Sequence, residues 1–322
     1  MINVALVSAW HVHAGEYASR INNNKDSRIC AVWDNDADRG REFAGRLGVP
    51  FVESYDELCA NPQIDAVVIS SSTDLHRELM VKAADAGKHI FTEKVLALTN
   101  EDAEAIADAV KKNGVHFTIC LPHERERAFI LAKSLIDEGK LGRVSYAKFR
   151  KAHTGSVDNW LPPHFYNEKE CGGGAMVDLG AHPMYMLLWL LGKAVRVSST
   201  FTEMSGRGVE DNAVSVIEFE GGAIGVIETG FMTWGDPLTL EVSGSDGYLI
   251  IQDGQVRYHT RNSGGWIIPE LPRETSHPVD YFVSSVVNNS ANDMFGIDEA
   301  VSLTRLMSAA YRSHKSNSKA DI

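Results

Sequence analysis

Up to residue 120, short continuous apolar runs alternate with amphipathic segments. The runs are rich in Val, Ile, Ala and Phe, which is typical of parallel strands that are buried on both faces. They are INVALV (2–7), RICAVW (28–33), DAVVIS (65–70), KHIFT (88–92) and VHFTIC (115–120). Segments such as 75–86 and 100–112, between these runs, have helical periodicity. This alternation predicts an α/β domain with a doubly wound parallel sheet and helices on both faces.

After residue 122 the pattern changes to that of an α+β domain with a largely antiparallel, open sheet. Alternating apolar and polar residues over 195–260 predict its strands, and the turn sequences EGG (220–222) and DG (253–254) support antiparallel pairing. We expect further helices at 124–138, 173–191, 279–288 and 298–314, a strand at 143–151 and a loop at 262–272. The chain of 322 residues therefore divides into an expected Rossmann-type domain at 1–121 and a second domain at 122–322.

The composition narrows the classes of partner. The formal net charge is -12 and no basic run occurs, which argues against nucleic acid and anionic membrane surfaces. The longest apolar stretch, MYMLLWLLG at 184–192, is too short to span a bilayer. The four cysteines, Cys30, Cys59, Cys120 and Cys171, form no C-x-x-C pair, so we expect reduced thiols rather than disulfides or a zinc site. A soluble cytoplasmic protein is the resulting expectation.

The first apolar run ends in SAWHVH (8–13), at the carboxyl end of a strand, where doubly wound sheets bind their ligands. Asp34 follows the second run, where a carboxylate can accept hydrogen bonds from a ribose 2′-hydroxyl and repel a 2′-phosphate. This position favours NAD over NADP. The alternative is that Asp34 and its neighbours only cap the next helix. His11 and His13 form an H-x-H pair, but no Cys or carboxylate lies nearby in the sequence, so we expect no metal.

Three further stretches carry a resemblance to a known family. The first joins DAVVISSSTDLH (65–76) to AGKHIFTEK (86–94), the second is GGGAMVDLGAHP (172–183) and the third is VEDNAV (209–214). In this order, over nearly the whole chain, they resemble the glucose-fructose oxidoreductase and inositol dehydrogenase (Gfo/Idh/MocA) family. The resemblance implies a Rossmann domain that binds NAD(P), a C-terminal substrate domain, and hydride transfer at a sugar or cyclitol carbon. It also implies a homodimer or homotetramer, for which the open C-terminal sheet is the expected interface.

The resemblance also implies site residues. The family motif E-K-P matches Glu93-Lys94-Val95, and G-G-G-x-x-x-D-x-G-x-H matches 172–182, which makes Lys94, Asp178 and His182 the catalytic candidates. The expected cofactor-binding residues are Ser8, Ala9, Trp10, His11, Val12, Asp34, Ser71, Thr73, His76, Glu93 and Lys94. The cofactor is expected to be NAD, with NADP as the alternative.

The same residue types suit this chemistry on their own. Oxidation of a secondary alcohol removes a hydride and a proton, so it needs a base near neutral pH and a cation beside the developing alkoxide. His182 can be the base and Lys94 the cation, while Asp178 lies four residues before His182 and would share its face of a helical turn. The alternatives are a solvated surface lysine and a cap or turn role for the Asp and the His. The glycines at 172–174 indicate a close backbone approach rather than a phosphate cradle.

Several positions depart from the family pattern. The glycine fingerprint falls on Ser8, Trp10 and His13, so we expect Trp10 to crowd the cofactor or to bend the loop away. The helix N-terminus, the Ser8 hydroxyl and the loop imidazoles still offer donors to a phosphate. Val95 replaces the proline of E-K-P and removes one constraint on the lysine before it. Tyr185 stands where many relatives have an acidic residue, and a phenol selects different partners from a carboxylate.

A further set of residues is expected around the substrate. An aromatic face can cover the apolar side of a sugar ring while imidazoles bond its hydroxyls. The substrate-binding candidates are His123, Trp160, His164, Asp178, His182 and Tyr185. Equally, Trp160 and Phe165 can pin an irregular loop to the core. The basic residues of the strand at 143–151 are expected on its exposed side, although Arg150 can also face the pocket: Lys148, Arg150 and Lys151.

Three functions remain open from the sequence. The first is an NAD(P)-dependent oxidoreductase that acts on a CH–OH group of a sugar, a sugar derivative or a cyclitol. The second is a glycosidase of the same family that uses bound NAD transiently and accumulates no NADH. The third is a sensor that binds a dinucleotide without catalysis, and the joint presence of Lys94, Asp178 and His182 argues against it.

Overall fold

The computed structural model describes residues 1–235, 238–273, 275–290 and 294–322. These residues form two compact units, Met1–Leu121 with Ser276–Thr304, and Pro122–Thr275 with Arg305–Ile322. The division expected from the sequence keeps 122–322 together, whereas here the segment 276–304 belongs to the first unit. Among the described residues, no helix combines the length and hydropathy needed to cross a membrane.

The described part of the first unit is built on a sheet of five parallel strands in the order β2-β1-β3-β4-β5. The strands are β1 (Ile2–Val7), β2 (Ser27–Trp33), β3 (Ala66–Ile69), β4 (His89–Thr92) and β5 (Phe117–Ile119). Phe51 adds a single parallel bridge to Val32 beyond β2. With this bridge counted, the order is that of a Rossmann sheet whose third strand is reduced to one residue, and it reverses between β1 and β3. The predicted doubly wound sheet is confirmed.

Helices lie between these strands, and two of them begin and end at residues that suit helix termini. They are α1 (Ala14–Asn23), α2 (Ala37–Leu47), α3 (Tyr55–Ala60), η1 (Thr73–Leu75), α4 (His76–Asp85) and α5 (Asn100–Asn113). The Asp36 carboxylate caps α2, and Thr99 caps α5 through its hydroxyl. Gly48 and Gly114 end these two helices in the left-handed region, which glycine adopts without steric cost. The helices predicted at 75–86 and 100–112 therefore form, with ends shifted by one residue or so at most.

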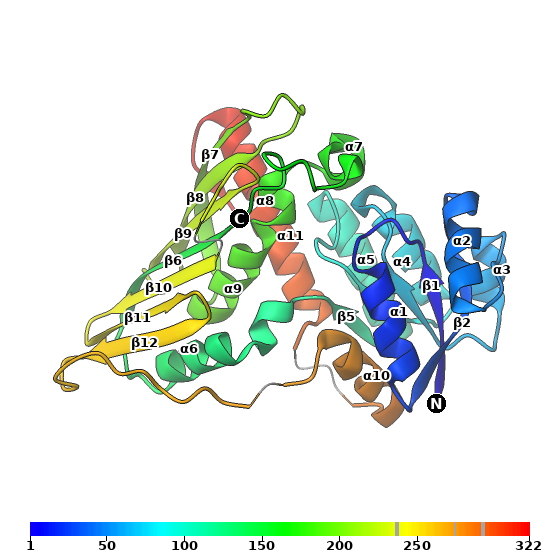
Figure 1. The fold of residues 1–322 in the computed structure, drawn as a ribbon, viewed down its shortest axis with the longest axis horizontal. Coiled ribbons are helices and arrows are strands. Elements are labelled where there is room, and N and C mark those ends of the chain that lie inside the picture. The colour runs from blue at the N-terminus through cyan, green and yellow to red at the C-terminus, as the bar shows by residue number, and fades with distance from the viewer. Residues whose placement is uncertain (236–237, 274, 291–293) are drawn as a thin grey trace. The chain divides into compact units, whose positions relative to one another are not determined.

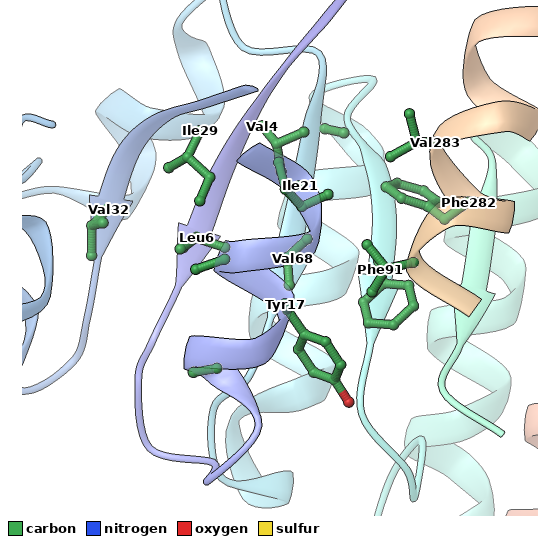
Figure 2. Close-up of a cluster of buried hydrophobic side chains, with 14 of the residues drawn as sticks. Val4, Leu6, Tyr17, Ile21, Ile29, Val32, Val68, Phe91, Phe282 and Val283 are labelled. Carbon is green, nitrogen blue, oxygen red and sulfur yellow. The ribbon is translucent and has the colours of Figure 1, made fainter. Parts of the chain in front are cut away.

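One helix of the first unit comes from far along the chain. α10 (Pro278–Asn288) places Val279, Phe282 and Val283 in the same buried cluster as residues of β1, β4 and α1 (Figure 2). The ring centroids of Phe282 and Phe91 are 5.9 Å apart. In Figure 1 the orange helix α10 lies beside α1 and β5. An amphipathic helix must cover an apolar surface, and this burial explains why the segment returns to the first unit.

The second unit is built on a mixed sheet with the order β12-β11-β10-β6-β9-β8-β7-β13 over its described strands. These are β6 (Val144–Ala152), β7 (Ala194–Thr202), β8 (Asn212–Phe219), β9 (Ile224–Gly230), β10 (Leu238–Gly244), β11 (Gly247–Gln252), β12 (Gln255–Thr260) and β13 (Ala320–Asp321). Of these pairs, only β6 and β9 run parallel. The predicted turn Asp253-Gly254 joins β11 and β12 with both residues in the left-handed region. The largely antiparallel sheet is confirmed.

Helices α8 and α9 pack on one face of this sheet. The helical elements of the second unit are η2 (Pro122–Arg125), α6 (Arg127–Asp137), η3 (Pro163–Tyr166), α7 (Glu168–Cys171), α8 (Ala175–Asp178) and α9 (Ala181–Leu191), and α11 (Ile297–Ser316) crosses from the first unit into the second. The helix expected at 124–138 begins later because 122–125 forms a 3-10 turn. The single helical segment expected at 173–191 is two helices, which separate at Leu179 and Gly180.

Candidate functional site

The candidate cofactor residues of the first unit follow the carboxyl ends of its strands. Ser8 follows β1, Asp34 follows β2, Ser71 and Thr73 follow β3, and Glu93 and Lys94 follow β4. Parallel strands bring these ends to one edge of the sheet. The backbone N–H of His11 donates to the carbonyl of Ser70 at 2.9 Å, so the loops after β1 and β3 are joined where the strand order reverses.

Ser8 makes the turn that a glycine makes in the usual fingerprint. Its φ is 69°, in the left-handed region, where steric strain costs a residue with a Cβ about 1–2 kcal/mol of conformational free energy. The hydroxyl donates to Oδ1 of Asp34 at 3.2 Å and accepts from the N–H of Trp10 at 3.2 Å. These bonds offset the strain, so the tight turn is kept although the glycine is not. Whether Trp10 crowds a cofactor stays a prediction.

Asp34 is fully buried and binds the loop instead of capping α2. The cap belongs to Asp36, whose carboxylate accepts the N–H groups of Asp38 and Arg39. Oδ2 of Asp34 accepts the N–H of Ala9 at 2.8 Å, and Arg39 forms a bidentate pair with both carboxylate oxygens at 2.5 and 2.8 Å. The sequence analysis missed Arg39, although a basic residue in the first turn of the helix after Asp34 was a visible signal.

Glu93 is the centre of a buried network that lies against the loop after β1. Its Oε1 is 2.8 Å from Nδ1 of His13 and 3.4 Å from Nδ1 of His11. The same oxygen accepts a short hydrogen bond from the hydroxyl of Tyr17, on α1. The sequence shows no carboxylate beside the H-x-H pair, but the fold supplies one, because the sheet brings the end of β4 to that pair.

The network has a definite charge distribution. Burial alone would raise the pKa of Glu93, but the imidazoles of His11 and His13 outweigh it and hold this pKa well below its usual range. The hydrogen bond to Glu93 raises the pKa of His13, which favours the imidazolium. Burial raises the pKa of Tyr17 far above its ordinary value, so the phenol stays protonated and donates to the carboxylate. A buried anion therefore holds a cation at the start of α1.

The start of α1, with the imidazole of His13, suits a diphosphate. His11, His13 and Glu93 each offer one atom to a metal ion, and these atoms lie within 4.8 Å of one another. A proton joins Nδ1 of His13 to Oε1 of Glu93, which lie 2.8 Å apart, and Nδ1 of His11 accepts the N–H of His13 at 3.3 Å. The side chain of His13, the N-cap residue of α1, is 49% exposed and makes no capping hydrogen bond to the first turn of the helix. A helix N-terminus beside an imidazolium fits the phosphates of a dinucleotide.

His76 fixes the segment that follows Lys94. It is buried, and its Nδ1 lies 3.1 Å from the carbonyl oxygens of both Val95 and Leu96. Burial lowers the pKa of His76, so the neutral ring donates its Nδ1 proton to these carbonyls. The N–H of Lys94 donates to Oε2 of Glu93 at 3.2 Å, and the Lys94–Val95 peptide bond is cis. These contacts give His76 a positioning role, and its expected cofactor contact stays a prediction.

The second unit holds a separate cluster of imidazoles. His123, on η2, and His182, in the first turn of α9, are both buried, and their ring centroids are 4.8 Å apart. The hydroxyl of Tyr185 accepts the backbone N–H of His123 at 3.1 Å and lies 3.2 Å from Nδ1 of His182. The structure therefore brings together three of the residues expected around the substrate.

Lys151 belongs to this cluster, and its expected place on the exposed side of a strand is wrong. Its Nζ lies 2.7 Å from Nε2 of His123, whose Nδ1 is 2.5 Å from Oε1 of Glu126. An ammonium can only donate, so Nε2 accepts and the Nδ1 proton goes to Glu126. Alternation along β6 puts Lys151 on the face of the buried Phe149, and Lys148 on the opposite one. That period of two was the signal the sequence analysis overlooked.

Asp178 and His182 lie on two short helices rather than one. Asp178 is the last residue of α8 and is half-buried. The backbone stays in the right-handed region through Leu179 and Gly180, so the chain continues to turn in the helical sense up to His182. Pro183 lies in the first turn of α9, where the N–H that it lacks would have no partner within the helix.

The glycine run before α8 serves backbone packing, as expected. A Cβ at Gly173 would collide with the hydroxyl of Tyr311, and one at Gly174 with the carbonyl of Glu210. Oε1 of Glu210 also accepts the N–H of Gly174 at 2.9 Å and that of Met176 at 3.0 Å. The run therefore fixes the start of α8, which carries Asp178.

The loop before α7 has one aromatic residue buried in the core and one exposed. Phe165 is buried in a cluster with Phe231 and pins the loop. Trp160 is 54% exposed, and its ring centroid lies 4.5 Å from that of His153. His164 is half-buried, and its carbonyl accepts a hydrogen bond from the thiol of Cys171, the last residue of α7. Trp160 therefore presents an aromatic face, while Phe165 holds the loop to the core.

Comparison with known proteins defines the class. Residues 2–120 match the family model described as "Oxidoreductase family, NAD-binding Rossmann fold", and residues 129–250 match the "GFO/IDH/MocA C-terminal domain". The chain belongs to the GFO/IDH/MocA family of oxidoreductases, and its first unit is the family's NAD-binding domain. The resemblance stated from the motifs is confirmed.

Individual relatives are enzymes of sugars and cyclitols. The 1,5-anhydro-D-fructose reductase of Ensifer adhaerens is 32% identical over 231 residues, which are 69% of this chain and 67% of that one. The scyllo-inositol 2-dehydrogenase (NAD(+)) of Bacillus subtilis is 28% identical over 86% of this chain and 84% of its own. The crystal structure of GenD2 from gentamicin A biosynthesis, in complex with NAD, has a TM-score of 0.84 and 25% identity, and covers 100% of this chain and 96% of that chain.

Proposed function

We propose that the chain is an NAD-dependent dehydrogenase or reductase acting on a secondary hydroxyl carbon of a sugar, a sugar derivative or a cyclitol. The observation that carries the proposal is the setting of His182, a buried imidazole whose Nδ1 lies 3.2 Å from the hydroxyl of Tyr185. When Nδ1–H donates to that oxygen, Nε2 keeps its lone pair, which is the tautomer that a general base needs. The similarity to the 1,5-anhydro-D-fructose reductase and to the scyllo-inositol 2-dehydrogenase supports the substrate class.

Each catalytic candidate then has a role that its chemistry allows. His182 takes the hydroxyl proton during oxidation and returns it during reduction. The ammonium of Lys94 stabilises negative charge on the reacting oxygen, and Asp178 either stabilises the imidazolium or binds the substrate. A nicotinamide, when bound, supplies or accepts the hydride.

The cofactor is proposed to lie along the carboxyl edge of the first sheet. The N-terminus of α1 and the half-exposed imidazole of His13 support the placement of its phosphates there. The residues proposed to hold it are Ser8, Ala9, Trp10, His11, Val12, Asp34, Ser71, Thr73, His76, Glu93 and Lys94, now with His13 added.

The substrate is proposed to contact the imidazole cluster of the second unit. His123 fixes the ammonium of Lys151 at 2.7 Å, so Lys151 is oriented to donate further hydrogen bonds to substrate hydroxyls. The exposed face of Trp160 suits the apolar side of a sugar ring. His164 and Tyr185 complete the proposed set.

A substrate screen with matched variants tests this function. Purified protein is incubated with NAD or NADH and a panel of sugars, sugar derivatives and cyclitols, and the nicotinamide absorbance is followed. With an active substrate, we expect His182→Ala and Lys94→Ala to slow turnover by about 100-fold or more. The surface controls His259→Ala and Lys112→Ala should leave the rate unchanged.

The other outcomes separate the alternatives. Turnover that survives in His182→Ala and Lys94→Ala contradicts the proposed roles. Cleavage of a glycoside with no net change in NADH identifies the NAD-using glycosidase. Dinucleotide binding without turnover across the panel favours the sensor.

We also infer that copies of the chain associate through the open face of the C-terminal sheet. Val214 and Val216 on β8 and Ile224 on β9 are 40–44% exposed on the side that α8 and α9 do not cover. Apolar strand faces of this kind are commonly buried by a second sheet, and twofold association of the same face closes the assembly. Light scattering should give a dimer or tetramer, and Val216→Glu should shift the protein towards the monomer. A monomeric wild-type protein contradicts the inference.

A cytoplasmic location is also proposed. Cys59, Cys120 and Cys171 are buried thiols, which suits a reducing compartment. Cell fractionation tests this, and recovery from an extracytoplasmic fraction would contradict it.

A further inference from the structure

The carboxylate of Asp34 accepts as many hydrogen bonds from the protein itself as its oxygens can accommodate. From the described residues, Oδ1 accepts the hydroxyl of Ser8 at 3.2 Å, the N–H of Asp36 at 3.0 Å and Nη2 of Arg39 at 2.5 Å. Oδ2 accepts the N–H of Ala9 and Nε of Arg39, both at 2.8 Å. A carboxylate offers about four lone-pair sites, and these five donors fill them. The side chain is 0% exposed, so water does not compete.

Arg39 is held in this position by several contacts. Its Nη2 also donates to the Asn35 side-chain oxygen at 3.1 Å and to the Ser8 hydroxyl at 3.3 Å. Gly40 lets α2 come close to the end of β2, because a Cβ there would collide with the ring of Phe51 and press on Asp34. The guanidinium is thus fixed beside the carboxylate, and 30% of the side chain remains exposed.

An acidic residue at this point selects against NADP in two ways. It accepts hydrogen bonds from the ribose 2′-hydroxyl of NAD, and its charge repels the 2′-phosphate of NADP. In this protein Asp34 has no lone pair left for the ribose 2′-hydroxyl unless one of its present donors leaves. The repulsion is cancelled because the paired guanidinium neutralises the charge, and a guanidinium binds phosphate well.

We propose that Arg39 determines the cofactor specificity of this protein, by removing the discrimination of Asp34 and binding a 2′-phosphate, so that NADP(H) binds as well as NAD(H). The proposal rests on the dinucleotide site of the proposed function. It concerns only the adenosine end of the cofactor, so it is independent of the substrate and of the catalytic residues.

Direct binding measurements test the proposal. The full chain is titrated with NADH and with NADPH, followed by nicotinamide fluorescence, as wild type, as Arg39→Gln and as the control Arg41→Gln. Arg41 lies on the same helix but pairs with the exposed Glu53 at 2.8 Å. We expect the two wild-type dissociation constants to agree within about tenfold, and Arg39→Gln to weaken NADPH at least about tenfold more than NADH. Arg41→Gln should change neither.

A competition experiment on the wild-type protein covers the case in which Arg39→Gln does not fold. Adenosine 2′,5′-bisphosphate should displace NADH at least as well as 5′-AMP. The proposal is overturned if NADPH binds more than about 100-fold more weakly than NADH, if adenosine 2′,5′-bisphosphate competes poorly, or if Arg39→Gln weakens both nucleotides equally. Binding of NADH alone leaves the proposed function intact, whereas failure to bind either nucleotide removes both.

Discussion

Replacing Glu93 by Gln tests whether one buried carboxylate organises the loop after β1. The substitution keeps the shape of the side chain but removes its charge. The new amide NH₂ can also face groups that now donate to the carboxylate, namely the hydroxyl of Tyr17 and Nδ1 of His13. We expect the variant to lose stability and His13 to lose its raised pKa.

The size of the effect follows from the contacts. Removing one member of a buried charge pair costs about 3–5 kcal/mol, but Gln still accepts some hydrogen bonds, and water reaches the half-exposed imidazole of His13. We therefore expect a loss of about 2–4 kcal/mol near pH 6, or roughly 3–6 °C in Tm for a chain of 322 residues.

The pH dependence has a definite sign. The folded pKa of His13 is raised, so its contribution is complete below the ordinary His value of 6.5 and is lost as the pH rises through the folded pKa. The folded pKa of Glu93 is lowered, so its contribution is present above the ordinary Glu value of 4.5 and is lost as the pH falls through the folded pKa. The gap in Tm between wild type and Glu93→Gln should therefore be largest between these values and shrink at alkaline pH.

Thermal denaturation followed by circular dichroism across this pH range is the assay. The control is Glu53→Gln, which breaks an exposed pair with Arg41 and should cost less than about 1 kcal/mol. The reasoning is refuted if Glu93→Gln melts within about 1 °C of wild type near pH 6, or if the gap widens as the pH rises from neutral to alkaline.

Three more predictions follow from other contacts. The affinity for NADH should fall as the pH rises through the pKa of His13, because the imidazolium beside the phosphates is lost; fluorescence titrations should show a flatter profile in His13→Gln. Phe282→Ala, at a fully buried ring, should destabilise the protein by about 3–5 kcal/mol and speed hydrogen exchange in β4 and α1, whereas the control Val287→Ala at a 40% exposed position should do neither. Lys151→Met should lower kcat/KM on an identified substrate by about tenfold or more and leave the dissociation constant of NADH unchanged, and an unaltered kcat/KM would exclude Lys151 from the substrate site.

The fold was predictable where it depends on local patterns. Strands β1, β3, β4 and β5 are largely buried on both faces and β2 is partly so, and their apolar runs therefore stand out in the sequence and give their positions within a few residues. The place of α10 was not predictable in this way. Its apolar face, with Phe282 and Val283, shows that the helix must cover something, but only the folded chain shows that it covers the first unit.

The candidate site likewise has a part that local sequence patterns predict and a part that they do not. Lys94 and His182 stand in recognisable motifs, and strand alternation contained enough information to place Lys151 beside the core. The contact of Glu93 with His13 and Tyr17 was out of reach, because it depends on which strands and helices are neighbours across a long separation in sequence. Spacing reveals residues that share one element, whereas ion pairs between elements require the strand order.

The missing glycine at Ser8 and the specificity of the cofactor site are connected through one carboxylate. A serine in the left-handed region needs a stabilising contact, and its hydroxyl obtains that contact from Oδ1 of Asp34 at 3.2 Å. A glycine would need no such bond and would leave that oxygen with one more site for a ribose hydroxyl. Arg39 takes most of the remaining capacity and neutralises the charge. The departure from the glycine fingerprint therefore makes the usual action of Asp34 harder, and the same two side chains, Ser8 and Arg39, hold the turn that the fingerprint would have made.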